Sequence, residues 1–336
     1  MTTASPRFAN RWKHVNLMRR VILTLAFTPL LLLPTATIYQ HFLAAHAYDM
    51  LPAGDRRLYD VMFRLTDWFI TDPDQFDLVK GTTWAATLLG YKISDPLAVV
   101  SQLSARFHMF WPLAASAVIP VLFTVLFGRF FCGWICPANL LYELADTFGA
   151  ILREAGLPLG DRRFDRRLKY LVLAVGVAAS AVLGNVVMSP IYPPAIVGRE
   201  IYYTIAGTAA GAGTAFFAVT VLFDLLVAKR GFCRYLCPGG ALYSLLGRYR
   251  LVRIQRQVSL CNDCTKCNRA CMFDLDPMAD GFGQECNNCA ACIAVCPTGS
   301  LSFALAAKDA APQGPGHLGA GFKRARKRVH TGESKD

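Results

Sequence analysis

The chain has 336 residues, of which 54% are hydrophobic and only 17% charged, with a formal net charge of +12 and a mean hydropathy of +0.34. A soluble domain would carry about 25% charged residues. This composition argues against a purely soluble protein and favours one that inserts into a membrane.

Four apolar stretches are each long enough to cross the hydrocarbon core of a bilayer as a helix. The first follows a basic leader, residues 1–20. It is longer than a signal-peptide core and lacks a small-residue cleavage site, so we expect it to be retained. The four predicted transmembrane helices are residues 21–40, 108–127, 170–188 and 202–228.

The segment between the first two spans, residues 41–107, contains eight Asp. Two pieces of it, Leu58–Ile70 and Thr83–Phe107, have helical apolar spacing that charged residues interrupt. Such pieces are typical of helices that lie along a membrane surface. We therefore expect 41–107 to be an aqueous loop with interfacial helices.

The distribution of basic residues predicts the orientation. Residues 1–20, 128–169 and 229–336 hold 28 of the 35 Lys and Arg residues, and the loops 41–107 and 189–201 hold the other seven. Because basic residues near helix ends stay on the cytoplasmic side, both termini should be cytoplasmic and these two loops periplasmic. The expected location is the bacterial inner membrane, crossed several times.

Eight of the twelve cysteines lie between Cys261 and Cys296, in two copies of the run C-x2-C-x2-C-x3-C. This is the bacterial ferredoxin run, in which the fourth cysteine of each copy ligates the other cluster. It predicts two [4Fe–4S] clusters. The first would be held by Cys261, Cys264, Cys267 and Cys296, and the second by Cys286, Cys289, Cys292 and Cys271.

Zinc and disulfides are the competing interpretations of these cysteines. Zinc sites close with four ligands, usually as two separated C-x2-C pairs, which leaves the doubled four-cysteine run unexplained. A disulfide framework needs an oxidising compartment, whereas the predicted topology places this domain in the cytoplasm.

The other four cysteines form two C-x3-C-P motifs, Cys132/Cys136 and Cys233/Cys237, at a constant offset of 101 residues. Leu141 and Tyr142 recur at that offset as Leu242 and Tyr243, which indicates an internal repeat. The i,i+4 spacing predicts that both sulfurs of a pair lie on one helical face. Three roles remain open: a third cluster or other metal centre, a redox-active dithiol pair, or buried packing.

The expected fold is thus an all-α membrane bundle of four transmembrane helices in two repeated halves, followed by a small α+β domain of the bacterial 2[4Fe–4S] ferredoxin type. The cytoplasmic loop 128–169 carries the first C-x3-C-P motif. Beyond the fourth span come the second C-x3-C-P segment (229–254), the ferredoxin domain (255–305) and a disordered basic tail (306–336).

Two ionisable residues in or beside the predicted spans are weak catalytic candidates. Asp224 lies near the cytoplasmic end of the fourth span, where it could accept a proton or simply pair with Arg129 or Lys229. His108 lies at the outer end of the second span beside Trp111, where an aromatic belt explains it as well as a ligand role does. The basic tail suits anionic lipid or solvent, and we expect no nucleic-acid partner.

These residues resemble the NapH-type membrane-bound ferredoxins and, more loosely, the NosR, MauN and CcoG proteins. The resemblance is carried by the two C-x3-C-P motifs, Asp95-Pro-Leu, Phe223-Asp-Leu-Leu-Val, Cys237-Pro-Gly-Gly-Ala-Leu-Tyr and the doubled ferredoxin run. It departs at Met272, where the first run usually has Pro. The family implies a quinol dehydrogenase component that passes electrons from quinol through 4Fe–4S clusters to a partner ferredoxin and a periplasmic reductase or cytochrome.

Two other functions stay open. By analogy with the CcoG proteins, the chain could be a copper reductase or an assembly factor for a metallo-oxidoreductase, because soft thiolates select Cu(I). It could also be a scaffold whose clusters only stabilise the cytoplasmic domain.

Overall fold

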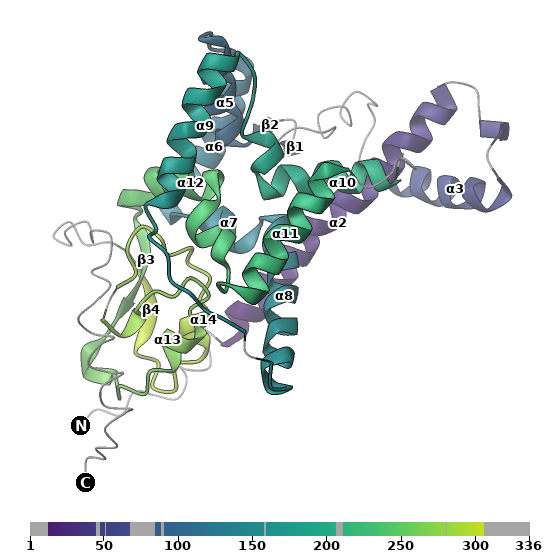
Figure 1. The fold of residues 1–336 in the computed structure, drawn as a ribbon. Helices are drawn as coiled ribbons and strands as arrows, with labels where there is room; N and C mark the ends of the chain where they lie inside the picture. The colour runs from purple at the N-terminus through teal and green to yellow at the C-terminus, as the bar shows by residue number, and fades with distance from the viewer. Residues whose placement is uncertain are drawn as a thin grey trace. The chain divides into compact units, whose positions relative to one another are not determined.

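The computed structural model describes residues 13–44, 48–50, 52–67, 85–88, 91–157, 159–205, 211–279 and 281–305 (Figure 1). The predicted basic tail, residues 306–336, lies outside the described residues, as does most of the predicted leader.

The chain forms two compact units. The cysteine-rich unit comprises residues 1–19, 124–133 and 243–336, and the helical unit comprises residues 20–123 and 134–242. The first unit thus contains the eight-cysteine run together with the short segment 124–133, which carries Cys132 of the first C-x3-C-P motif. This grouping does not follow the order of the chain.

Four helices overlap the predicted spans: α2 (Lys13–Ala44), α6 (Trp111–Phe127), α9 (Leu168–Leu183) and α11 (Ala212–Leu226). Within the described residues, one stretch, His14–Leu32 of α2, is long and apolar enough to cross a membrane. The other three helices are apolar but have 17, 16 and 15 residues. A mostly helical architecture is confirmed, whereas the four membrane crossings stay a prediction.

The predicted fourth span, 202–228, is not one helix. Helix α10 (Pro193–Ile205) ends inside this range, at Ile205, and α11 starts at Ala212. The carboxylate of Glu200 accepts hydrogen bonds from the backbone N of Gly211 (2.9 Å) and Oγ1 of Thr214 (2.7 Å). It thereby satisfies free N–H groups at the positive end of α11, which favours a new helix start at this point.

The segment Thr83–Phe107 was wrongly predicted to be helical throughout. Strands β1 (Ala85–Leu88) and β2 (Tyr91–Ser94) form an antiparallel pair, and only α5 (Pro96–Arg106) is helical. Proline disfavours the helical conformation in the residue before it, and Asp95 accordingly has an extended ψ of 127°. Its carboxylate caps the helix by accepting a hydrogen bond from Leu97 N (2.9 Å). The bundle is therefore not purely α-helical.

The other predicted interfacial piece, Leu58–Ile70, is helical as far as it is described: α3 (Ala53–Asp67) covers it up to its last described residue.

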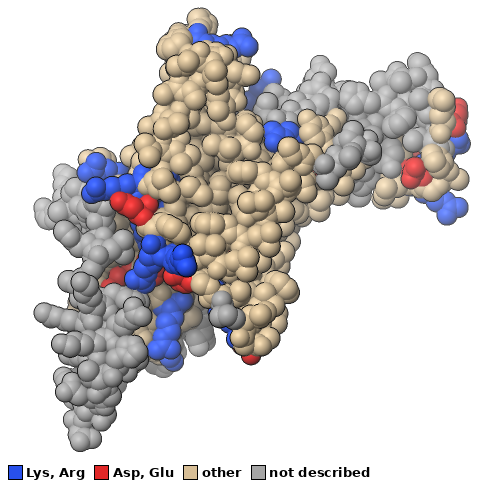
Figure 2. Space-filling view, in the orientation of Figure 1, with Lys and Arg blue, Asp and Glu red and all other residues tan. Residues whose placement is uncertain are grey.

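Within the helical unit, α9 packs against α5, while α11 packs against α10 and α8 (Pro137–Glu154) (Figure 1). Large apolar side chains on these helices face outward: Val182 is 84% exposed and Val219 62%. The surface over α9 and α11 is accordingly tan, almost without charged residues (Figure 2).

The cysteine-rich unit contains a small antiparallel sheet. Strand β3 (Val252–Arg256) pairs with β4 (Leu301–Leu305), with Ile254 opposite Phe303. The short helices α13 (Lys266–Ala270) and α14 (Ala291–Ala294) carry Cys267 and Cys292. The buried core consists of Ile254, Phe282, Ala290, Ile293 and Leu301 together with Cys267, Cys286 and Cys292. Cysteines are thus part of the core itself, an arrangement that positions their sulfurs within the unit.

Candidate functional site

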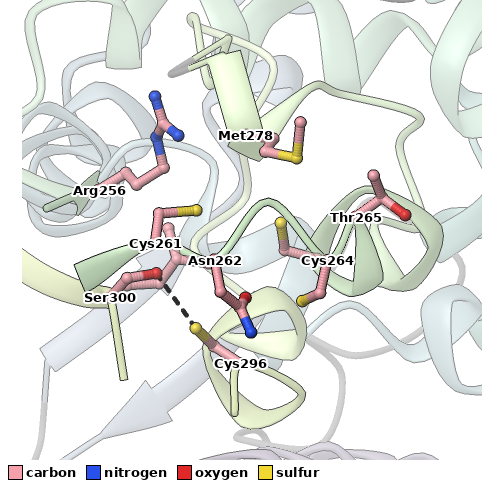
Figure 3. Close-up of a pocket in the computed structure, with 10 residues that line it drawn as sticks. Arg256, Cys261, Asn262, Cys264, Thr265, Met278, Cys296 and Ser300 are labelled. Atoms are coloured by element: carbon pink, nitrogen blue, oxygen red, sulfur yellow. Dashed lines mark hydrogen bonds between the residues drawn. The ribbon is translucent and has the colours of Figure 1, made fainter. Parts of the chain in front are cut away.

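The four cysteines of the first predicted cluster line one cavity (Figure 3). They come from the loop before α13, from α13 and from the turn after α14. The cavity is completed by Arg256, Asn262, Thr265, Met278, Ser300 and Leu301. Cys296, the cysteine from the far end of the run, joins Cys261, Cys264 and Cys267, which is the exchange that the ferredoxin spacing predicts.

The four cysteines of the second predicted cluster also lie near one another. Burial raises the pKa of the Cys271 thiol to about 12, and the neighbouring Cys289 and Cys286 raise it too. Burial likewise raises the pKa of Cys292, with added repulsion from Cys289, Cys286 and Cys271. Such repulsion weakens as the distance between the two charges grows and as solvent screens them. The structure therefore groups this second set from residues that are up to 21 positions apart in the sequence.

Both groups fit an iron–sulfur cluster chemically. Buried thiols resist ionisation, and Cys267 too has a pKa raised by burial, to about 11. A metal centre compensates for this, because thiolate ligation replaces the protons with positive charge. Among the described residues, no three His, Cys, Asp or Glu side chains converge on a single metal ion. The first group instead surrounds a cavity (Figure 3), which suits a polynuclear centre with one thiolate on each iron.

Cys296 differs from the other ligands in its hydrogen bonds. Burial alone would raise its pKa, but hydrogen bonds with Ser300 (3.2 Å) and Thr298 (3.6 Å) lower it below the ordinary value of a thiol. Hydrogen bonds to the ligating sulfurs help to set the potential of iron–sulfur centres. Ser300 and Thr298 are therefore candidate tuning residues for the first group.

The two C-x3-C-P motifs do not place their sulfurs on one helical face, contrary to the prediction. Helix α7 (Phe130–Trp134) ends before Cys136, and the π-helical turn η3 (Phe232–Leu236) ends before Cys237. Cys136 has φ −58° and ψ 117°, and Cys237 has φ −63° and ψ 116°. The proline that follows each cysteine excludes the helical conformation. Both copies share this break, so the repeat extends to the backbone.

Three of the four C-x3-C-P thiols lie near one another in the helical unit. Burial raises the pKa of Cys233, and repulsion from Cys237 and Cys136 raises it further. Cys136 belongs to the first copy of the repeat, so the fold brings the two copies together here. The fourth thiol, Cys132, belongs to the cysteine-rich unit.

Of the two weak catalytic candidates, only Asp224 is buried. Its Oδ1 accepts a hydrogen bond from the backbone N of Phe232 (2.8 Å), while its Oδ2 has no hydrogen-bond partner among the described residues. Arg129, one of its expected ion-pair partners, instead pairs with Glu285. His108 is exposed in the turn before α6, where no contact points to a ligand role.

Sequence reasoning did not predict the buried ion pairs of two arginines, Arg129 and Arg230. Nη1 of Arg129 lies 2.6 Å from the carboxylate of Glu285, the residue before Cys286. Arg230 pairs with Asp146 and with the side-chain oxygen of Asn139. A signal was present, since both arginines occupy the same position of the repeat, at the offset of 101. Their carboxylate partners, Glu285 and Asp146, do not occupy equivalent positions of the repeat, so the repeat does not predict them.

Comparison with known proteins identifies a protein family whose pattern matches both copies of the repeat. The family described as "4Fe-4S binding domain" matches twice, at residues 107–154 and 210–257. Each match contains one C-x3-C-P motif and confirms the internal repeat. No solved structure matches the chain.

Curated relatives match a large part of the chain. The ferredoxin-type protein NapH of Haemophilus influenzae is 31% identical over 67% of this chain and 80% of its own length. NapH of Escherichia coli is 29% identical over 61% of this chain and 72% of its own. The methylamine utilization ferredoxin-type protein MauN of Methylorubrum extorquens is 33% identical over 58% of this chain. The chain spans 66% of the length of that MauN protein.

Two groups of four cysteines in a ferredoxin-like unit, joined to a helical unit with a repeated 4Fe–4S binding pattern, define an iron–sulfur electron-transfer protein. The chain belongs to the family of the NapH and MauN ferredoxin-type proteins.

Proposed function

We propose that this protein is a membrane-anchored electron-transfer subunit that takes electrons from quinol and relays them through two [4Fe–4S] clusters to a partner redox protein. The observation that carries the proposal is the interleaved grouping of the eight cysteines, in which Cys296 joins the first group and Cys271 the second. Neither zinc pairs nor a disulfide framework require this exchange of the fourth cysteine. The clusters would supply one-electron chemistry when bound.

The membrane part of the proposal is supported by the exposed apolar faces. Trp111 of α6, Val182 of α9 and Val219 of α11 are 75%, 84% and 62% exposed. Soluble proteins rarely leave large contiguous apolar patches facing water. In a bilayer the same side chains would face lipid. With α2, these helices would be the four spans, with the termini and the cysteine-rich unit in the cytoplasm.

The protons released by quinol need an acceptor, because oxidation of one quinol to quinone yields two electrons and two protons. Asp224 is the candidate on this chain, since its free Oδ2 is buried close to Cys233. The C-x3-C-P thiols would hold a third cluster or act as a redox-active dithiol pair. A partner ferredoxin and a periplasmic reductase or cytochrome would receive the electrons.

The test is anaerobic purification followed by iron and acid-labile sulfide analysis and by reduction with a short-chain quinol, monitored by electron paramagnetic resonance. We expect about eight iron atoms from the two ferredoxin-type groups and reduction of at least one centre by the quinol. Iron-free protein loaded with zinc would refute the electron-transfer function. Clusters that dithionite reduces but the quinol does not, with the partner ferredoxin present, would refute quinol as donor.

A copper reductase is the second candidate, and the proximity of the Cys136, Cys233 and Cys237 thiols favours it. Soft thiolates select Cu(I). Reduction of Cu(II) by the cluster-reduced protein, lost in Cys233→Ser, would support this function. Binding of no copper at all by the purified protein would exclude it.

A further inference from the structure

Two loops of the cysteine-rich unit share a sequence pattern and a backbone shape but differ in exposure. Residues 261–264 and 286–289 read C-N-D-C and C-N-N-C, at an offset of 25. Their third residues have φ of 55° and 52°, and the residues after the loops have φ of 58° and 60°. The central residues of the first loop are exposed, whereas Asn287 and Asn288 are 3% and 2% exposed. The second loop is therefore covered, and the first is not.

The cover is the segment that leads into the first C-x3-C-P motif. The side-chain amide of Asn288 donates a hydrogen bond to the carbonyl oxygen of Phe127 (2.8 Å). Gly133 packs directly on Asn287, because a Cβ at Gly133 would lie 2.9 Å from the Asn287 carbonyl oxygen. Only glycine permits this approach. Both residues belong to the cysteine-rich unit, so the contact lies within one compact body.

A buried ion pair fixes the same two segments against each other. Nη1 of Arg129 lies 2.6 Å from Oε2 of Glu285, and the two side chains are 1% and 10% exposed. The same Nη1 also donates to the Glu285 carbonyl oxygen (3.3 Å), and the guanidinium lies 5.1 Å from the ring centroid of Phe273. Because Glu285 directly precedes Cys286, this pair holds a cysteine of the second group beside the segment that carries Cys132.

The contact makes a short path between Cys132 of the first C-x3-C-P motif and Cys286 of the second cysteine group. One peptide bond joins Cys132 to Gly133, a van der Waals contact joins Gly133 to Asn287, and one peptide bond joins Asn287 to Cys286. In the corresponding loop of the first group, 261–264, the central residues Asn262 and Asp263 are exposed. The two groups are thus unequal in position.

We infer that electrons enter at the second cysteine group, Cys271/Cys286/Cys289/Cys292, across the contact between Gly133 and Asn287. The first group, Cys261/Cys264/Cys267/Cys296, is then the outer one, from which a soluble partner redox protein takes electrons. This inference rests on the proposed function and adds the order of the two groups. Each step moves one electron and no atom: the donor side loses one electron and the acceptor side gains it. The quinol is the reductant and the partner protein the oxidant.

Paired variants of the full-length protein test the order. Cys286→Ser/Cys289→Ser removes ligands of the second group, and Cys261→Ser/Cys264→Ser is the matched change in the first. The iron content of each variant should show that one of the two clusters remains. A short-chain quinol should still reduce the remaining cluster when the first group is altered, but should no longer reduce it when the second group is altered. Reduction of the first group at the unaltered rate in Cys286→Ser/Cys289→Ser would overturn the inference.

The contact itself is tested by Asn287→Ala, with Gln257→Ala as its control, because Gln257 is an exposed residue of the same unit and does not line the cavity of the first group. We expect several-fold slower reduction of both clusters by quinol in Asn287→Ala, with midpoint potentials and iron content unchanged. Gln257→Ala should keep the unaltered rate of reduction. Equal rates in the two variants would count against a path through Asn287.

A readout that needs no quinol separates this inference from the proposed function. A soluble dysprosium–EDTA complex shortens the electron spin relaxation of exposed centres, and the dithionite-reduced variants report one cluster each. We expect the dysprosium complex to shorten the spin relaxation of the first group more than that of the second. An equal or larger effect on the second group would overturn the order of the groups. Failure of quinol to reduce the unaltered protein would count against the proposed function alone.

Discussion

Arg129 and Arg230 occupy the same position in the two copies of the repeat, and each is buried beside a different carboxylate. Arg230 pairs with Asp146 of the first copy. The residue equivalent to Asp146 in the second copy is Gly247, which packs against Gly128, the neighbour of Arg129. The cysteine-rich domain supplies the missing carboxylate to Arg129 through Glu285. One position of the repeat therefore forms a buried ion pair within the helical unit in one copy and within the cysteine-rich unit in the other.

Loss of the Glu285 carboxylate should destabilise the cysteine-rich unit. In Glu285→Ala the guanidinium of Arg129 would remain buried without its partner, which costs about 3–5 kcal/mol. We expect the iron–sulfur absorbance to be lost at a clearly lower temperature than in the unaltered protein. In Arg129→Met/Glu285→Met, with no buried charge left, most of that stability should return. Equal melting of the single and double variants would contradict this account of the pair.

Loss of the Asp146 carboxylate should act on the helical unit instead. Asp146→Ala leaves Arg230 buried without its ion-pair partner, at a similar cost of about 3–5 kcal/mol. Thermal unfolding followed by circular dichroism in detergent should shift downward. The iron content of the two ferredoxin-type groups should stay the same, because none of their ligands lies in this unit. A loss of that iron would mean that the two units are not independent in stability.

Iron analysis decides the role of the C-x3-C-P motifs. If they hold a third cluster, Cys132→Ser/Cys233→Ser should lose about four iron atoms and an equal amount of acid-labile sulfide. Asn262→Ala is a suitable control, because its side chain lines a cluster cavity without supplying a sulfur. Unchanged iron in the double cysteine variant would leave dithiol chemistry or packing as the role of these residues.

Asp224 is tested by its isosteric amide. Asn at this position keeps the hydrogen bond from Phe232 N but cannot accept a proton as a carboxylate does. If Asp224 receives a quinol proton, quinol oxidation should slow by about 10²–10⁴-fold, the usual contribution of a general base. The control is Asp161→Asn, whose side chain is 49% exposed. A rate within a few-fold of the unaltered protein would remove Asp224 from the mechanism.

Gly239, which directly follows the second C-x3-C-P motif, tests helix packing. A Cβ at Gly239 would collide with the ring of Tyr192, which is 1% exposed and cannot move away easily. Overpacking of this kind costs about 1–3 kcal/mol, so Gly239→Ala should lower the melting temperature. Gly54→Ala is the matched control, since nothing lies within 4 Å of its Cβ position. Equal melting of the two variants would contradict the close packing of Tyr192.

Much of the site could be predicted because cluster ligands follow a covalent spacing rule. The C-x2-C-x2-C-x3-C runs predict which cysteines act together. In the structure Cys296 lines a cavity with the first three cysteines, and Cys271 lies near Cys286 and Cys289; the ligation of clusters by these groups stays a prediction. The internal repeat could also be predicted from the sequence, and the two family matches confirm it. Local backbone chemistry was harder to read. Apolar spacing suggested helical structure where the strands 85–88 and 91–94 form. The i,i+4 spacing suggested that both sulfurs of each C-x3-C-P pair lie on one helical face, whereas Cys136 and Cys237 lie beyond the ends of α7 and η3.

By itself, the sequence determined the cysteine sets, the repeat and the apolar character of four helices, since each depends on residue type and on spacing along the chain. Only the tertiary structure decided which partners meet across long separations: Glu285 with Arg129, Asp146 with Arg230, and Asn287 with Gly133. Those contacts join segments 84 to 156 residues apart, and no local periodicity encodes them. They form because a buried charge requires an opposite charge and because glycine lets two backbones approach.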